Sequence, residues 1–554
     1  MIDTLITDVL VIGGGAAGLR AALAAAEAGS QVAVTNKGPV ARSGITLTAA
    51  GGLQAPFHPD DSPDIYFADT VECGYGLGDK NLARVLADDA CERALDVERY
   101  GARFVRNEAG EFDLLQFPGQ SRRRNLFFKG GGVGLMTGLA RACRKNERIS
   151  LIDDFFVTGL IKGVGNGDVA GAMGLNLRTG QLQLIQAKAT VMATGGCQRL
   201  WEVNDCPADA TGDGIVYAYR AGAQLVDMEM VLFYPSVVLW PPSLQGALVH
   251  YEFLAPDSLD GNVYDTSGRP VLPKPLPVRD AAMRVMDQAV RRGEGTARGG
   301  LLWYVGDSPR DAAMVRNKLN TLQYNYIKQH GVDPATARIE VAPGAHYLLG
   351  GIGIDEECAT SLTGLFATPE CAGNFDGANR LAGSGLTATQ VFGARAGLAA
   401  YRHASANGGS LPDSTSVEEE ETRVRTRLGA RSGEASVAEL RQRLANAVQE
   451  YAGVSRDGAG LERLLAIVGE LQATGAGIAV PSVARFNQPL VELLEFDAMC
   501  EAARIIAGSA LLRQESRGHH YRSDYPFMDD KQWLKHTTAV RTATGPVFGT
   551  RQVK

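Results

Sequence analysis

Three regions of different character predict that this chain of 554 residues adopts an α/β fold. Near the N-terminus, an apolar segment of strand type runs into glycines and then into an alanine-rich helical segment, which is the order of a Rossmann-like domain. Residues 234–341 are richer in proline and aromatic residues, and a glycine-rich pattern resumes after them. Segments beyond residue 409 show helical periodicity. We therefore expect a Rossmann-like dinucleotide-binding domain with an inserted α+β capping domain and a C-terminal helical domain.

The first β-α-β unit can be placed along the chain. Residues 8–12 (DVLVI) form a short buried strand, residues 13–18 a turn, and residues 19–28 a helix that ends at Gly29. The next strand covers residues 31–35. Later strands are predicted at 149–156, 171–176 and 189–193, and the last of these leads to a second glycine cluster.

The same segments set the expected domain boundaries. The dinucleotide-binding domain has a first part at residues 1–233 and a second part at 346–408, and the capping domain covers 234–345. The C-terminal domain covers 409–554, and we expect its tail to be polar and irregular.

Composition excludes several classes of function. A formal net charge of -7 provides no global basic field for nucleic acid or an anionic membrane. None of the eight cysteines forms a C-x-x-C pair, so we expect no metal or iron–sulfur site in this chain. The chain contains no apolar stretch of about 18 residues, and residues 1–8 have no basic start of a signal peptide. We expect a cytoplasmic protein with reduced thiols and no direct membrane insertion.

The turn Gly13-x-Gly15-x-x-Gly18 follows the first strand and opens the first helix. Glycines allow a tight turn and a close approach of the backbone to phosphate, and the helix N-terminus supplies N–H groups and a positive dipole end. In this context the motif predicts a site for the pyrophosphate of a dinucleotide.

The second strand ends in Thr35-Asn36-Lys37, without the acid that binds ribose in a standard NAD site. Glu370, in the segment FATPECAG, is a candidate for the missing ribose acid. These features favour FAD over NAD.

Segments spread over nearly the full length resemble the flavoprotein subunit of the succinate dehydrogenase/fumarate reductase family, which also includes L-aspartate oxidase and adenylylsulfate reductase. They are KGPVARS at 37–43, AAGG at 49–52, ATGG at 193–196, TGDG at 211–214, VRD at 278–280, HY at 346–347, GANRL at 377–381, ESRG at 515–518 and DYP at 524–526.

The resemblance implies roles for three residues. Arg279 corresponds to the arginine that delivers a proton to the substrate carbon, and His346 and Arg380 correspond to the pair that binds a substrate carboxylate. This set is chemically sensible, because hydride addition to an activated C=C bond builds negative charge that cationic groups stabilise in a closed site. A positioned side chain must then supply the proton.

The expected cofactor contacts come from the same segments. They are Gly13, Gly15, Ala16, Ala17, Gly18, Thr35, Lys37, Ser43, Gly44, Thr46, Ala50, Gly51, Gly52, Ala193, Thr194, Gly195, Gly196, Asp213, Glu370, Arg380, Ser384, Gly385 and Leu386.

One departure from the family concerns the flavin linkage. The family's covalent-flavin histidine lies in a Ser-His-Thr segment, whereas this chain has Ser43-Gly44-Ile45-Thr46. We therefore expect FAD to be held non-covalently. Loss of that bond generally lowers the flavin potential, which favours reduction of the substrate or a different substrate.

A second departure concerns one end of the pocket. The family's Phe-His-Pro-Thr motif is here FYPS at 233–236, which makes Tyr234 a candidate substrate contact. The family's Thr-Glu relay segment is not recognisable; VHYEF at 249–253 stands in its place. Glu252 is the candidate relay acid, and His250 and Tyr251 are candidate substrate contacts. A larger or mono-anionic enoate, a CoA thioester or an aromatic-derived acid fits such a pocket better than plain fumarate or succinate.

The resulting hypothesis is an FAD-dependent oxidoreductase that acts on a small carboxylate or acyl substrate and exchanges electrons with an iron–sulfur partner subunit. Two alternatives stay open. One is chemistry like that of adenylylsulfate reductase or L-aspartate oxidase, and the other is a non-catalytic, FAD-carrying electron-transfer subunit.

Overall fold

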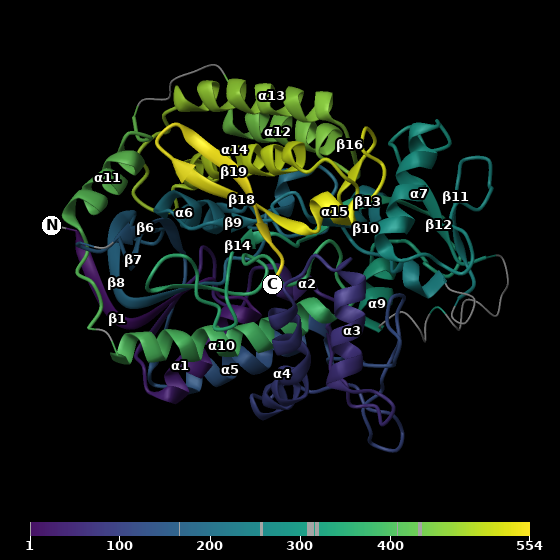
Figure 1. The fold of residues 1–554 in the computed structure, drawn as a ribbon, viewed down its shortest axis with the longest axis horizontal. Helices are drawn as coiled ribbons and strands as arrows, with labels where there is room; N and C mark the ends of the chain where they lie inside the picture. The colour runs from purple at the N-terminus through teal and green to yellow at the C-terminus, as the bar shows by residue number, and fades with distance from the viewer. Residues whose placement is uncertain are drawn as a thin grey trace.

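The computed structural model describes residues 2–165, 167–254, 259–306, 315, 321–406, 408–429 and 435–554 (Figure 1). A seven-stranded sheet forms the centre of the first domain, with the order β5-β2-β1-β8-β7-β6 and with β15 paired to β8. The strands are β1 (Asp3–Ile12), β2 (Val32–Thr35), β5 (Ile149–Ile152), β6 (Phe155–Lys162), β7 (Val169–Asn176), β8 (Gln181–Met192) and β15 (Leu365–Ala367). Strands β5, β2, β1, β8 and β15 run parallel. Their carboxyl ends therefore open on one edge, where ligands bind in such folds.

Three helices cover one face of this sheet and lie together in Figure 1. They are α1 (Ala16–Ala28), α5 (Gly131–Lys145) and α10 (Ser384–Ala406), and α4 (Lys80–Arg99) packs beside α10. Helices α1 and α10 approach closely because Gly397 has no side chain: a Cβ atom there would lie 2.2 Å from the carbonyl oxygen of Ala21. Helix α6 (Asp213–Ala221) packs against β6.

The inserted region forms its own four-stranded sheet, with the order β10-β13-β12-β11. The strands are β10 (Val231–Trp240), β13 (Ile339–Leu348), β12 (Leu301–Tyr304) and β11 (Asn262–Tyr264), and they pack with α7 (Arg279–Arg291). A separate apolar core forms here around Val238, Trp303 and Val341. The pairing of β10 with β13 shifts register on both sides of Tyr234. Such irregularities redirect side chains next to binding sites.

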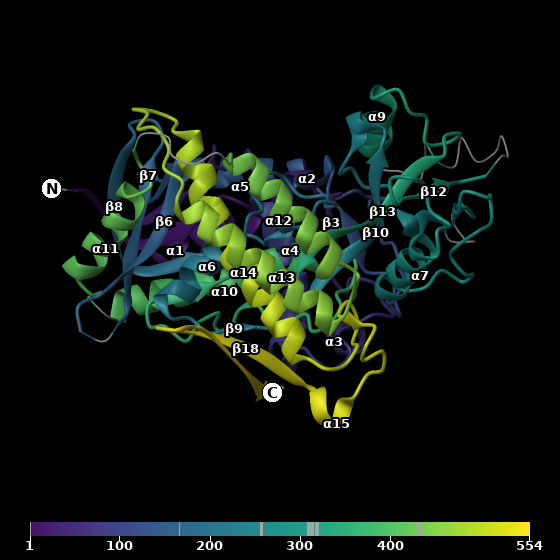
Figure 2. The same cartoon turned by 90° about the horizontal axis from the view of Figure 1, so that it is seen from above.

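Most of the C-terminal region is helical. Helices α12 (Val437–Tyr451), α13 (Gly458–Ala476) and α14 (Gln488–Leu512) pack against one another and run side by side in Figure 2, and α11 (Ser414–Arg425) packs on β6. The amphipathic repeat of leucines in α12 and α13 explains this packing, since Leu444 and Leu464 are fully buried.

The expectation of an irregular tail was wrong. Strands β18 (Lys535–Thr542) and β19 (Gly545–Gln552) form a regular hairpin, and β18 pairs with β9 (Leu225–Val226) of the first domain. The buried positions of β18 are mostly polar, because His536 and Thr537 bond to the buried carboxylates of Asp227 and Glu229. The sequence of such a strand does not alternate between apolar and polar residues, so that pattern could not predict it.

Short elements complete the chain: α2 (Ile45–Thr48), β3 (Gly52–Gln54), α3 (Pro63–Cys73), β4 (Asn125–Phe127), η1 (Gln198–Leu200), η2 (Pro242–Leu244), η3 (Tyr251–Leu254), α9 (Thr321–Gln329), β14 (Gly351–Ile352), β16 (Ser455–Arg456), β17 (Tyr521–Arg522) and α15 (Asp530–Trp533). Within the described ranges, no helix combines the length and apolar character that a membrane crossing requires.

Candidate functional site

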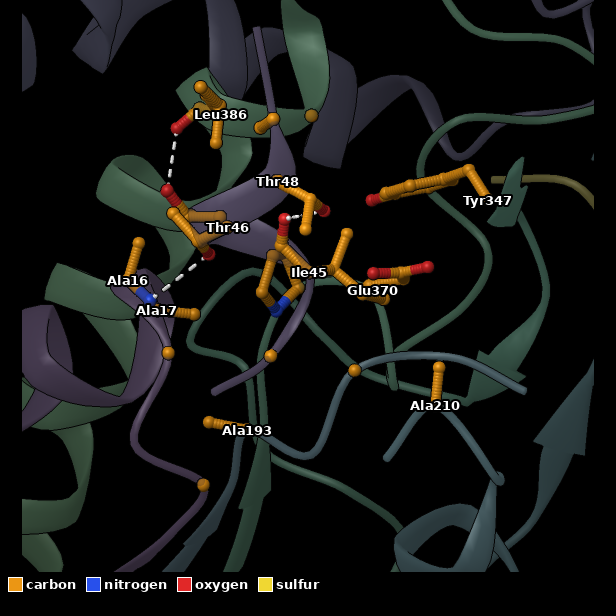
Figure 3. Close-up of a pocket in the computed structure, with 18 of the residues that line it drawn as sticks. Ala16, Ala17, Ile45, Thr46, Thr48, Ala193, Ala210, Tyr347, Glu370 and Leu386 are labelled. Atoms are coloured by element: carbon orange, nitrogen blue, oxygen red, sulfur yellow. Dashed lines mark hydrogen bonds between the residues drawn. The ribbon is translucent and has the colours of Figure 1, made fainter. Parts of the chain in front are cut away.

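A pocket extends from the glycine turn after β1 to the first residue of α7 in the capping region. Its lining joins segments that are far apart in sequence: residues 12–17, 35–37, 43–46, 48–52, 193–195, 205, 209–210, 213–214, 248, 250, 252, 346–347, 369–370, 380, 382–383, 385–386 and several single residues, most of them aromatic. Figure 3 shows Ile45, Glu370 and Tyr347 converging on one part of this pocket.

The glycine turn has the geometry that a phosphate site requires. A Cβ atom on Gly13 (φ +116°) would lie 2.2 Å from the carbonyl oxygen of Ala193, and one on Gly18 would lie 1.9 Å from the carbonyl oxygen of Gly13. At Gly15, by contrast, the nearest atom to such a Cβ is the Thr46 hydroxyl at 3.7 Å, so the turn is open there. Helix α1 starts without a side-chain cap on Gly15. Its first N–H groups can therefore receive an anionic ligand.

The loop after β2 is braced by Asn36, a residue that the sequence did not single out. Its Oδ1 accepts from Gly14 N at 3.0 Å, and its Nδ2 donates to Ser43 Oγ at 2.8 Å. The Asn36 side chain therefore joins the glycine turn to the loop of residues 38–43.

Lys37 lies in the pocket lining, but its ammonium group is already bonded to three neighbouring side chains. Its Nζ contacts Thr211 Oγ1 at 2.9 Å, Asp213 Oδ1 at 3.2 Å and Glu495 Oε1 at 2.8 Å. Burial alone would lower the pKa of Lys37, but Asp213 and Glu495 outweigh it and raise the pKa. Lys37 is thus a permanent cation that joins the cofactor pocket to α14.

Glu370 lines the pocket on the far side of β1 from β2. It follows β15, which pairs with β8, whereas β2 is the other neighbour of β1. Gln198 donates to its carboxyl group, and burial raises the pKa of Glu370 to about 7. An acid in the usual ribose position would follow β2. Glu370 therefore lies on the opposite side of β1 from the usual position of the ribose acid.

His346 and Arg380 form one end of the pocket. His346 Nδ1 lies 2.6 Å from Asp205 Oδ2, and the guanidinium of Arg380 lies 4.1 Å from the centre of the Tyr347 ring. The Nε atom of Arg380 is buried and has no hydrogen-bond partner within the described part of the chain. This end is suited to an anionic ligand, because a buried guanidinium without a partner lacks the stabilisation that an acceptor provides.

Arg279 lies across the pocket, at the start of α7. Its Nε and Nη2 donate to Glu252 Oε1 at 3.1 and 2.9 Å, while its Nη1 has no hydrogen-bond partner among the described residues. Burial alone would raise the pKa of Glu252, but Arg279 outweighs it, and the pKa falls to about 2. Glu252 is thus a carboxylate that orients Arg279.

The second carboxylate oxygen of Glu252, Oε2, bonds to a side chain other than Arg279. The Tyr234 hydroxyl donates to Glu252 Oε2 and also lies 2.9 Å from His250 Nδ1. The His250 side chain is 18% exposed, whereas that of Glu252 is 4% exposed. These groups form a continuous hydrogen-bonded chain from Arg279 towards solvent.

The structure brings most of the predicted site residues into the pocket lining. The exceptions are Gly18, Gly196, Ser384 and Tyr251, which do not line the pocket. Gly18 and Gly196 act by permitting close packing, and Ser384 bonds instead to the Tyr66 hydroxyl. The Tyr251 hydroxyl donates to Pro277 O at 3.2 Å, so the expected substrate contact of Tyr251 is replaced by a bond to the backbone that precedes α7. Within the described residues, no cluster of three metal-ligating side chains occurs.

Several aromatic residues and acids in the lining were missed, among them Phe117, Tyr347 and Asp205. Phe117 faces Phe253 with 6.3 Å between ring centres, and Tyr347 lies under Arg380. Asp205 bonds to His346. They sit in loops or next to known motifs and carry no periodic pattern, so only their spatial position reveals them.

Comparison with known proteins identifies the family of the chain. A model described as "FAD binding domain" matches residues 8–386, and one described as "Fumarate reductase flavoprotein C-term" matches residues 441–554. The chain is 36% identical to one subunit of the fumarate reductase (CoM/CoB) of Methanothermobacter marburgensis over 94% of each chain. It is 30% identical to the fumarate reductase flavoprotein subunit of Escherichia coli, covering 98% of this chain and 93% of that protein.

Solved structures give the same result. E. coli quinol fumarate reductase FrdA superposes with a TM-score of 0.91 at 29% identity, covering 100% of this chain and 97% of that chain. Adenylylsulfate reductase from Archaeoglobus fulgidus superposes with a TM-score of 0.80 at 19% identity, covering 100% and 96%. At that identity the second match shows a shared fold only.

Proposed function

Because the chain belongs to the flavoprotein-subunit family of succinate dehydrogenase and fumarate reductase, which are FAD-dependent oxidoreductases, we propose that it moves a hydride and a proton across a C–C bond next to a carboxyl or acyl group. The observation that carries this proposal is the presence of Arg279, His346 and Arg380 in one pocket with the glycine turn. FAD, when bound, supplies or accepts the hydride.

The chain's own residues bind the substrate and deliver the proton. His346 and Arg380 bind and orient the substrate carboxylate, which places the adjacent carbons between the cofactor and Arg279. Arg279 hands a proton to the substrate carbon when the substrate is reduced. Glu252, Tyr234 and His250 return a proton to Arg279 through the hydrogen-bonded chain described above. His250 is the group in that chain nearest to solvent by exposure.

The other end of the pocket favours an uncharged substituent on the substrate. It is lined by Phe117, Leu248 and Tyr234, and the Tyr234 hydroxyl is already bonded to Glu252 and His250. A second carboxylate here would lose water and would meet the negative charge of Glu252, to which Arg279 is already bonded. We therefore favour a mono-anionic enoate or acyl substrate over plain fumarate or succinate, although several relatives are named fumarate reductases.

Cofactor binding and electron exchange complete the proposal. Glu370 would accept a hydrogen bond from a hydroxyl of FAD, and Ile45, which has no nucleophilic atom, would leave that FAD without a covalent link. An iron–sulfur partner subunit exchanges electrons with the flavin. In this arrangement the chain works in the cytoplasm, and only its partner brings it to a membrane.

The test is a single-turnover assay without oxygen. The holoprotein is reduced and then mixed with fumarate, cinnamate or crotonate, and flavin absorbance is followed. We expect cinnamate or crotonate to reoxidise the flavin faster than fumarate, and saturated acids to leave it reduced. If none of the enoates exceeds the rate in buffer, the proposed reaction is wrong; if only fumarate does so, the proposed substrate class is wrong.

A further inference from the structure

We propose that Asp205 is a positioning residue that makes the His346 end of the pocket selective for a carboxylate over an uncharged group. The proposal rests on the proposed function, since it assigns a role at the same site. It concerns binding, however, and does not require turnover.

Asp205 contacts His346 with good geometry. Its Oδ2 lies 2.6 Å from His346 Nδ1, its side chain is 7% exposed, and both residues line the pocket. The remaining contact of its carboxylate within the described residues is a weak one, from Cys206 Sγ to Oδ1 at 3.5 Å. The charge of Asp205 is therefore directed mainly at the imidazole.

The backbone holds the two residues in register. Asn204 forms a parallel bridge with Ala345, and Ala345 N donates to Val203 O at 2.9 Å. On the other side, Gln198 Nε2 donates to His346 O at 3.2 Å. The segment from η1 to Asp205 thus clamps the end of β13 by both backbone and side chain, so the imidazole has little freedom to turn.

This arrangement determines which ring atom meets a ligand. A carboxylate at Nδ1 requires a proton on Nδ1, so Nε2 is the nitrogen left for the pocket. To bind a substrate carboxylate, Nε2 must also carry a proton. In the proposed complex the ring donates one N–H to Asp205 and the other to the ligand carboxylate, so the charge of Asp205 stabilises the bound form that a carboxylate requires and an amide does not.

Neighbouring charges make Asp205 necessary for this effect. Arg380 lies at the same end of the pocket. The buried His519 is also close enough to interact electrostatically with His346. Of the two, Arg380 carries a permanent charge that opposes a second cation at this end of the pocket, whereas burial holds the pKa of His519 well below its usual range and leaves that ring neutral. Glu370 offers only partial compensation, because burial raises its pKa to about 7. Asp205 is the nearby acid that contacts the ring directly.

The experiment measures dissociation constants in the oxidised holoprotein from changes in flavin absorbance. The probes are cinnamate and fumarate, each paired with its uncharged amide, cinnamamide or fumaramide. Asp205→Asn keeps an acceptor for Nδ1 and removes the charge, and Asp205→Glu keeps the charge. Glu202→Gln is the matched control, because Glu202 lies in the same loop and is exposed.

We expect Asp205→Asn to weaken binding of cinnamate about tenfold and to leave cinnamamide within about twofold, with unchanged thermal unfolding. Asp205→Glu should recover part of the preference for the acid, and Glu202→Gln should match the wild type. Equal weakening of acid and amide would indicate a merely structural role and overturn the proposal. So would an unchanged acid-to-amide ratio in Asp205→Asn, or a wild type that binds none of the probes. If the wild type prefers the acids and Asp205→Asn loses that preference, but the wild type does not reduce any enoate, only the proposed reaction is contradicted.

Discussion

At the scale of single residues, the site pairs each cation with a group that sets its direction. Glu252 holds two nitrogens of Arg279, Asp205 holds one nitrogen of His346, and Tyr347 lies beneath Arg380. Arg279 Nη1 and Arg380 Nε are buried and have no hydrogen-bond partner among the described residues. This is how side chains can be pre-oriented for a charge that develops only during the reaction.

Ile45 gives a prediction at this scale. An isoleucine has no nucleophilic atom, so no bond to the flavin can form at this position. We expect acid precipitation of the holoprotein to release all of its FAD into the supernatant, measured by absorbance, with a colourless pellet. A yellow pellet after repeated washing would show a covalent link from another residue.

Sequence and structure differ most in residues whose role depends on a neighbour far along the chain. The positions of Arg279, His346 and Arg380 could be predicted because each lies in a motif shared with the family. Asp205 could not, because its partner is 141 positions away and no local pattern joins them. Tyr251 was expected in the pocket, but its neighbour Glu252 points there instead and Tyr251 bonds to the backbone before α7.

At the scale of elements, the glycine turn joins β1, α1 and β8. The close approach of Gly13 to Ala193 brings the end of β8 against the turn, and Gly18 lets α1 start directly beneath it. The β-α-β unit was predictable from sequence, since its apolar strand, its glycines and its alanine-rich helix are all local signals. The hairpin β18–β19 was not, because polar partners fill its buried positions.

Gly18→Ala tests this element. Its new methyl group would lie 1.9 Å from the carbonyl oxygen of Gly13, so the turn must shift. We expect the variant to lose most of its FAD or to fail to fold, measured as the ratio of flavin to protein and as soluble yield. Gly469→Ala is the matched control. It lies in α13 with no atom near its Cβ position and should keep a full complement of FAD. A fully loaded Gly18→Ala protein would contradict the account of the turn.

At the scale of the whole molecule, the pocket lies where three regions meet. Asn379 Nδ2 donates to Asp280 of α7 at 3.0 Å, and its Oδ1 lies 3.0 Å from His519 of the C-terminal region. Asn379 and Asp280 are the sequence neighbours of Arg380 and Arg279. The relative position of the two arginines therefore depends on contacts among the FAD-binding, capping and C-terminal regions. The C-terminal region is in turn held by Arg513, which is fully buried and bonds to Glu229.

The most direct test of the central claim is the rate at which an enoate reoxidises the reduced flavin in Arg279→Lys, compared with the wild type. Arg291→Lys, an exposed change on the same helix, is the control. We predict that Arg279→Lys binds FAD and cinnamate normally but reacts at least about a hundredfold more slowly, whereas Arg291→Lys reacts like the wild type. Reoxidation of Arg279→Lys at the wild-type rate would contradict the assignment of proton delivery to this pocket.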